Sequence, residues 1–178
     1  IAPGLSSKGI NLGLMHFSGC GGVSYPLKPG PNNQGRLSQL VNSFSPGGGT
    51  PLAGALRRAG QQMQGGSVDK RIVLLSDGKE TCGGDPVAVA SRFASSNLKI
   101  HVIGFDVGSG AASQLRKIAR AGGGKYNQAQ SAQQLQDAFE QLSKNLEKDL
   151  LKKMRSCVEL GAGNKRKSSL DSHRAVPK

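Results

Sequence analysis

The sequence has few aromatic residues, few cysteines and no long apolar run. Aromatic residues make up 4% of its 178 residues and tryptophan is absent, so a core must be built from Leu, Ile, Val and Ala. No run of about eighteen apolar residues occurs, so no segment of this sequence is expected to span a membrane. The three cysteines, Cys20, Cys82 and Cys157, are too few for a disulfide framework and lack zinc-binding spacing.

The charge of the chain is strongly positive and unevenly spread. The formal net charge is +13, and residues 151–178 contain eight basic and two acidic residues, a net +6 that leaves +7 for the first 150. After about residue 150 the sequence becomes small, polar and charged, which is typical of a disordered tail. We therefore expect a folded domain over residues 1–150 and a basic, disordered tail over residues 151–178.

The periodicity of apolar residues indicates an α/β fold. Continuous apolar runs predict strands buried on both faces, as in parallel sheets, and period-3.6 stripes predict helices. The alternation predicts a doubly wound, mostly parallel sheet with helices on both faces. Residues 23–28 follow the first strand too closely for a crossover, so they predict an antiparallel edge strand, which Pro26 suits. The other predicted strands are 10–17, 71–76, 99–105 and 125–129, and the predicted helices are 35–44, 51–64, 86–96, 112–121 and 131–146.

Thr50 and Asp77 are the residues most suggestive of a site. In a doubly wound sheet, function lies at the carboxyl ends of the strands, and the helix entry at 45–52 lies at the same edge. Thr50 and Asp77 are therefore expected to approach one another and to offer the oxygen ligands that Mg²⁺, Mn²⁺ or Ca²⁺ prefer. Each also has a local interpretation: Thr50 as helix N-cap before Pro51, and Asp77 with Gly78 as a turn.

Three blocks of the sequence resemble one known family. "GGGTPLAGAL", "RIVLLSDGKETCGGDP" and "IHVIGFDVG…LRKIARAGGGKYNQAQSAQQLQDAF" are similar to the von Willebrand factor type A (vWA) domain, in order, from about residue 10 to residue 146. The resemblance implies that Thr50 and Asp77 are the second and third parts of a metal-ion-dependent adhesion site. Gly47, Gly48 and Gly49, which have no side chains, would then leave the Thr50 hydroxyl as the group of this loop that reaches the ion. Ser76 and Gly78 would support the same site.

The first part of that adhesion site is missing from the sequence. The family carries an Asp-x-Ser-x-Ser loop after a central first strand, and no such motif occurs here. We therefore expect this chain to be part of a longer protein whose intact domain holds Mg²⁺, Mn²⁺ or Ca²⁺. The alternative is that strands 10–17 and 71–76 have closed up against each other, because unpaired buried backbone groups are costly.

Cys20 and Cys82 both follow strands at the same edge of the predicted sheet. A disulfide between them is one alternative and would indicate an oxidising, extracytoplasmic or secreted setting. Two free thiols are the other alternative, because a central strand between them would hold their Cα atoms too far apart. Cys157 lies near the tail and is expected to be free.

The function implied by the resemblance is protein binding or adhesion, without enzymatic activity. A carboxylate from a protein partner would complete the coordination of the metal, and no small-molecule substrate is expected. No base–nucleophile pair can be named, and His16 and His101 lie in apolar strands, where structural roles are expected. The alternative function is a metal-independent basic scaffold that binds anionic polymers through residues 151–178. Nucleic acid is a disfavoured partner, because no aromatics are interleaved with the basic residues to stack on bases.

Overall fold

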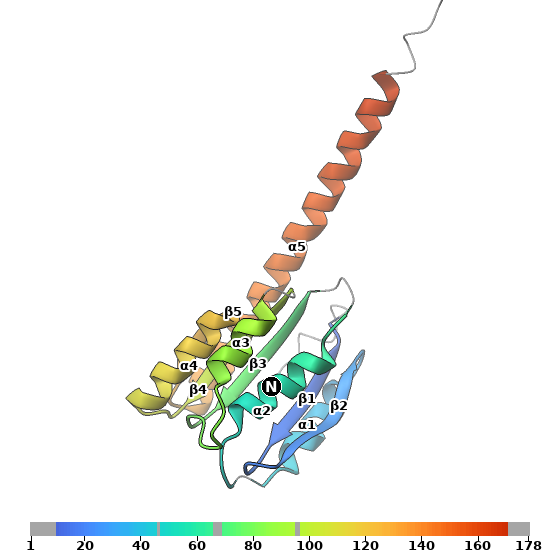
Figure 1. The fold of residues 1–178 in the computed structure, drawn as a ribbon. Helices are drawn as coiled ribbons and strands as arrows, with labels where there is room; N and C mark the ends of the chain where they lie inside the picture. The colour runs from blue at the N-terminus through green and yellow to red at the C-terminus, as the bar shows by residue number, and fades with distance from the viewer. Residues whose placement is uncertain (1–9, 46, 66–68, 95–96, 171–178) are drawn as a thin grey trace, which may run out of the picture. The chain divides into compact units, whose positions relative to one another are not determined.

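The computed structural model describes residues 10–45, 47–65, 69–94 and 97–170. The chain divides into two compact units, residues 1–139 and residues 140–178. The first unit contains all the strands of the described residues and is an α/β domain, as predicted from the sequence (Figure 1). The elements in chain order are β1 (Leu12–Phe17), β2 (Val23–Gly30), α1 (Gln34–Asn42), α2 (Leu52–Gln62), β3 (Lys70–Ser76), α3 (Pro86–Ala94), β4 (Leu98–Phe105), α4 (Ser109–Ala121), β5 (Gly123–Ala129) and α5 (Ala132–Leu170).

The strands form a parallel sheet and a separate antiparallel hairpin. The order in the parallel sheet is β3-β4-β5, and Ser76 at the end of β3 lies opposite Gly104 near the end of β4. The hairpin pairs β1 with β2, which confirms the antiparallel strand predicted for residues 23–28. Within the described residues β1 does not pair with β3. The alternative in which these two strands close up against each other is therefore wrong.

Apolar side chains from α2 explain how the hairpin and the sheet stay together without a shared ladder. Leu52 and Leu56 are almost completely buried, and Phe17 of β1 packs against the cluster that contains them and Leu74 of β3. Burial of each such side chain contributes roughly 1.5–3 kcal/mol. Helix packing thus replaces the backbone hydrogen bonds that closed-up strands would have formed.

Strand β4 is the centre of the core. Ile100, Val102 and Ile103 have no exposed surface, so burial of β4 on both faces, as predicted, is confirmed. For β3 the same prediction is wrong, because Val73 and Leu75 are 39% and 41% exposed. These two side chains alternate with buried Leu74 and Ser76, so only one face of β3 is covered.

Helix α5 is longer than its sequence pattern predicted. It continues to Leu170, through residues that were assigned to a disordered tail, while residues 171–178 lie outside the described part. No proline occurs between Ala132 and Val176, and Leu, Lys, Arg, Glu and Met favour helix. Local propensity therefore sustains the helix where the apolar stripe ends. Among the described helices none is both long and apolar enough to cross a membrane.

Glycine occupies the residue between α4 and β5 and the first two positions of β5, because the backbones there approach closely. A Cβ at Gly122 would lie 2.6 Å from Cβ of Ile100, and a Cβ at Gly124 would collide with the Ile100 carbonyl group. Gly123 adopts φ +66°, a conformation that side chains disfavour. The glycines that follow the predicted helix 112–121 therefore allow β5 to pack closely against β4.

This close approach predicts opposite effects for two glycine substitutions. Gly124→Ala should lower the free energy of unfolding by about 2 kcal/mol or more, because the methyl group overlaps backbone that cannot move freely. Gly110→Ala, where a Cβ meets nothing in the first turn of α4, should be neutral or stabilise by up to about 1 kcal/mol. Urea unfolding followed by circular dichroism measures both, and equal stabilities would contradict the packing described for Gly124.

Candidate functional site

Three loops meet at the carboxyl ends of the parallel strands and form the rim, defined as residues 18–22, 47–50 and 76–84. The Ser18 hydroxyl donates to the Gly47 carbonyl at 2.8 Å, which ties the first two loops together. The Thr50 N–H donates to the Thr81 hydroxyl at 2.7 Å, and the Thr81 N–H donates to the Thr50 carbonyl at 3.1 Å. These bonds bring together loops that are about 30 residues apart in the sequence.

Thr50 lies close to the turn that carries Asp77 at the rim. The Thr50 hydroxyl oxygen is 3.5 Å from the position a Cβ would take at Gly78, the residue after Asp77. Asp77 is exposed, and its carboxylate has no hydrogen bond or ion pair with any part of the chain that the structure describes. Buried Ser76 donates to the Gly78 carbonyl at 3.0 Å and so holds the turn that presents Asp77.

Glu80, and not Thr50, caps the first turn of α2. The helix begins at Leu52 with Pro51 in the cap position and no side-chain bond from that position, so the interpretation of Thr50 as N-cap is wrong. One Glu80 carboxylate oxygen accepts from Ala53 N–H at 2.7 Å, and the other accepts from Cys82 N–H at 2.8 Å. A carboxylate is favoured there because helix N-termini carry partial positive charge.

The cap formed by Glu80 was missed because its partners are remote in sequence. Gln114 of α4 completes the arrangement by accepting from the Glu80 N–H at 2.8 Å. The only sign of this role in the sequence is that Glu80 is an acidic residue shortly after the end of a predicted strand. Asp85, by contrast, lies directly before its helix, and it accepts from the N–H groups of Val87 and Ala88, as an N-cap does.

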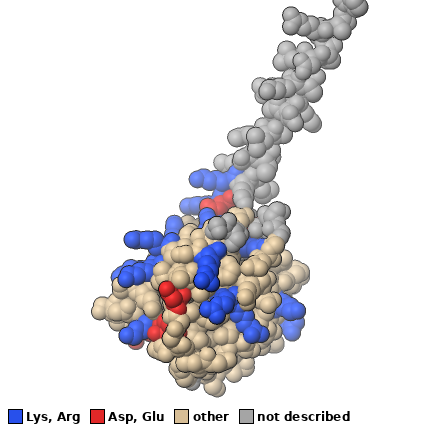
Figure 2. Space-filling view, viewed as in Figure 1, with Lys and Arg blue, Asp and Glu red and all other residues tan. Residues whose placement is uncertain are grey.

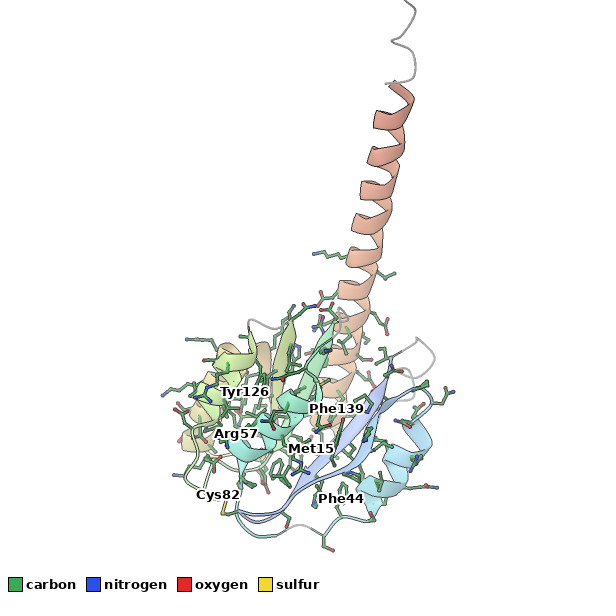
Figure 3. The ribbon with its side chains drawn as sticks, turned by 45° about the vertical axis from the view of Figure 1, so that its right-hand side comes forward. Met15, Phe44, Arg57, Cys82, Tyr126 and Phe139 are labelled. Carbon is green, nitrogen blue, oxygen red and sulfur yellow. A yellow bond between two sulfur atoms is a disulfide. The ribbon has the colours of Figure 1, made fainter. Side chains whose placement is uncertain are left out.

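A disulfide joins Cys20 and Cys82 across the rim (Figure 3). Their Cα atoms are 5.2 Å apart, and no strand among the described residues lies between them. The bridge packs on Gly49, where a Cβ would lie 2.7 Å from the Cys20 sulfur and 3.1 Å from the Cys82 sulfur. Gly48, with φ +80°, approaches the backbone of Gly19 just as closely. Close contacts therefore require glycine at positions 48 and 49, whereas a Cβ at Gly47 would meet nothing within 4 Å.

The sequence predicts metal ligands at two residues of the rim, Thr50 and Asp77. The Thr50 hydroxyl and the Asp77 carboxylate are oxygen ligands of the kind that Mg²⁺ accepts, but Mg²⁺ requires near-octahedral coordination. No group of three or more His, Cys, Asp or Glu that could hold a metal occurs within the described residues. Glu80, the nearest further carboxylate in the sequence, is bound to two backbone N–H groups. The described residues therefore do not complete a coordination shell.

The two histidines of the strands have structural contacts. His101 is buried, and its Nδ1 accepts from the Lys125 N–H at 3.2 Å, which links β4 to β5. His16 stacks on Phe44, with ring centroids 4.2 Å apart. Both contacts lie outside the rim.

The chain belongs to the von Willebrand factor type A domain family, which matches residues 2–141. It is 39% identical over 119 residues to the uncharacterized protein YwmC of Bacillus subtilis, covering 66% of this chain and 52% of YwmC. The chain spans about half the length of the curated relatives it matches. The vWA resemblance and the α/β fold predicted from the sequence are both confirmed.

Solved structures share the fold at low sequence identity. The conserved hypothetical protein BatB from Bacteroides thetaiotaomicron aligns with TM-score 0.62 and 17% identity, over 78% of this chain and 80% of that one. Proximal thread matrix protein 1 from the mussel byssus, with a zinc-occupied MIDAS (metal-ion-dependent adhesion site) motif, aligns with TM-score 0.55 and 20% identity, over 78% and 33% of the two chains. At this level of identity the likeness establishes the fold alone.

The contacts of Glu80 predict that it is structural, whereas Asp77 is not. Glu80→Ala should lower the free energy of unfolding by about 1–3 kcal/mol, because two N–H groups lose a charged acceptor. Asp77→Ala removes an exposed carboxylate without partners and should change stability by about 0.5 kcal/mol at most. Denaturant unfolding of both variants tests this, and a larger loss in Asp77→Ala than in Glu80→Ala would overturn the assignment.

The disulfide should contribute much of the stability of the domain. The two cysteines are separated by 62 residues, for which chain entropy predicts a stabilisation of roughly 4 kcal/mol. Replacing both Cys20 and Cys82 by Ala should lower the melting temperature by about 10 °C or more. Wild-type protein under reducing conditions should behave in the same way, and Cys157→Ala should melt as wild type does. An unchanged melting temperature in the double variant would contradict a structural role for the bridge.

Proposed function

We propose that this chain is a protein-recognition module that binds its partner at the rim. Domains of the vWA family are generally protein-interaction modules. The observation that carries the proposal is the exposed, unpartnered Asp77 carboxylate on a turn held by Ser76, whose next residue, Gly78, lies against the Thr50 hydroxyl. An exposed carboxylate held on a fixed turn is suited to intermolecular contact.

A divalent metal would join the rim to the partner. Thr50 and Asp77 would supply two oxygen ligands to Mg²⁺, Mn²⁺ or Ca²⁺, and a carboxylate of the protein partner would supply another. The zinc-occupied MIDAS motif of the mussel protein supports metal binding as a property compatible with this fold. Because the described residues do not complete the shell, affinity of this chain for the metal alone should be weak. The function proposed is binding or adhesion, and not catalysis.

The disulfide also supports a setting for this function. A bridge that packs against the Thr50 loop is maintained in oxidising compartments and reduced in the cytosol of most cells. We therefore propose an extracytoplasmic or secreted location. The alternative function, binding of anionic polymers through residues 151–178, has only the charge of that segment in its favour.

Paramagnetic Mn²⁺ tests the proposed site directly. Titration of the 178-residue chain should selectively broaden the amide signals of Thr50 and Gly78, with a dissociation constant of about 10⁻⁴–10⁻³ M or weaker. Asp77→Ala should weaken this effect about tenfold, which corresponds to about 1.4 kcal/mol. Asp137→Ala, which removes an exposed carboxylate from α5, is the matched control and should leave the broadening unchanged.

Acetate then serves as the simplest probe of the partner's carboxylate. Its addition should tighten Mn²⁺ binding in the wild type and not in Asp77→Ala. Equal broadening in wild type and Asp77→Ala would overturn the metal site. An acetate effect that is absent from the wild type would overturn the carboxylate-bearing partner.

A further inference from the structure

Three neighbouring helices of the first unit carry charge of one sign. Helix α3 contacts both α2 and α4, and together they cover one side of the sheet (Figure 1). None of the three contains Asp or Glu. We call their exposed basic residues the cationic layer: Arg57, Arg58, Arg92, Arg116, Lys117 and Arg120.

Acidic side chains of the described structure do not neutralise this layer. None of its six residues forms an ion pair with a described residue. Glu80 and Asp85 accept hydrogen bonds from backbone N–H groups at the starts of α2 and α3 instead. Figure 2 shows Lys and Arg side chains spread over this face and acidic ones confined to small areas. Protein surfaces commonly intersperse both signs, so a layer of one sign calls for an anionic partner.

Helix stability accounts for only some of these charges. Arg92 and Arg120 lie in the last turns of α3 and α4, where a cation complements the helix dipole. Arg116 lies over the Tyr126 ring, 5.0 Å from its centroid. Burial raises the pKa of Tyr126 and Arg116 partly offsets the rise, so the ring is neutral at pH 7. Arg57 and Arg58 lie in the middle of α2, so they do not complement a helix dipole, and neither is the cation over the Tyr126 ring.

The cationic layer lacks the apolar anchors of a protein-docking surface. Val73, Leu75 and Leu151 are the exposed large hydrophobic residues among those described, and all lie outside α2, α3 and α4. Protein interfaces generally need a buried apolar or aromatic centre. A partner of this layer is therefore bound through charge, and insertion of side chains into a bilayer core is not expected.

The chemistry of the layer fits phosphate groups displayed on a surface. Five of its six cations are arginines, whose guanidinium groups bind phosphate oxygens bidentately. Nucleic acid fits less well, because Phe93, the aromatic residue of these helices, is buried and cannot stack on a base. The helices also pack side by side, so none projects alone as a helix entering the major groove does.

We propose that the cationic layer of α2, α3 and α4 binds the anionic phospholipid surface of a membrane. The attachment is peripheral and electrostatic, and it requires no metal. It uses the folded domain, and so differs from polymer binding through residues 151–178. It is also independent of the rim, so Asp77→Ala should bind membranes as the wild type does.

Vesicle sedimentation of the 178-residue chain tests the proposal. The protein should bind phosphatidylcholine vesicles that contain about one-third phosphatidylglycerol, should not bind pure phosphatidylcholine, and should dissociate at about 0.5 M salt. The triple variant Arg57→Gln, Arg58→Gln, Arg92→Gln should bind at least about tenfold more weakly, since each cation near such a surface contributes up to about fivefold. The pair Lys117→Gln, Arg120→Gln provides a second variant on α4, with a loss of about fivefold or more.

A variant with the same number of charges removed from residues 151–178 distinguishes binding by the cationic layer from a general effect of net charge. Lys165→Gln, Arg166→Gln, Lys167→Gln removes the same charge from residues 151–178 and should weaken binding less than about threefold. Melting temperatures of the α2, α3 and α4 variants should lie within about 5 °C of the wild type, because the substituted side chains are exposed and loss of a cation from the last turn of a helix costs only about 0.3–1 kcal/mol. A loss in the tail variant equal to or greater than that in the α2–α3 variant would overturn the proposal. Absence of binding to anionic vesicles would also overturn it.

Double-stranded DNA provides the competing polyanion. Vesicles should compete DNA away from the wild-type chain when phosphate concentrations are matched at the same ionic strength. Tighter binding to DNA, lost in the α2–α3 variant, would overturn the membrane assignment and identify nucleic acid as the partner of the layer.

Discussion

The attachment of the β1–β2 hairpin to the parallel sheet is the constraint on which the rest of this structure depends. No ladder of backbone hydrogen bonds joins the two within the described residues. The buried side of α2 and the contacts of the rim take its place. The Cys20–Cys82 disulfide stabilises the fold by reducing the entropy of the unfolded chain. Glu80 stabilises the folded chain by accepting hydrogen bonds from two backbone N–H groups.

The same contacts hold the candidate site. Thr50 lies between the glycine loop that packs on the disulfide and helix α2, which Glu80 caps. The Thr50 N–H donates to the hydroxyl of Thr81, which lies in the loop after β3. Stability and site geometry are therefore coupled at the rim. Asp77 is the exception, because its carboxylate is exposed and bonded to nothing described. A residue that contributes little to folding and is held on a fixed turn is free to serve in recognition.

The rim and the cationic layer are two surfaces with different chemistry on one domain. The rim presents oxygen atoms suited to a divalent cation, and the layer presents arginines suited to phosphate groups. Metal coordination is directional and short-range, whereas the attraction of the layer to a charged surface acts over about 10 Å and falls with salt. A domain could accordingly be held at a membrane through one surface while the other binds a protein.

Much of the fold followed from local pattern. The apolar run of β4 predicted a strand buried on both faces, and the short spacing after β1 predicted the antiparallel β2. The proximity of Thr50 to the Asp77 turn also followed, because parallel strands and their crossover helices place these ends at one edge. The sequence pattern could not predict that one face of β3 is exposed. An apolar strand has the same sequence pattern whether one or both of its faces are buried.

The sequence by itself determined the class of fold, the family, the edge that carries the site and the positive charge of the chain, because these depend on residue type and periodicity. Tertiary structure alone decided the roles that depend on distance. It placed Glu80 on the first turn of α2, joined Cys20 to Cys82, packed Gly49 against the sulfur atoms and gathered the arginines of three helices into one layer. Those relations join residues far apart in the chain, and only the packing of helices on the sheet brings them within contact.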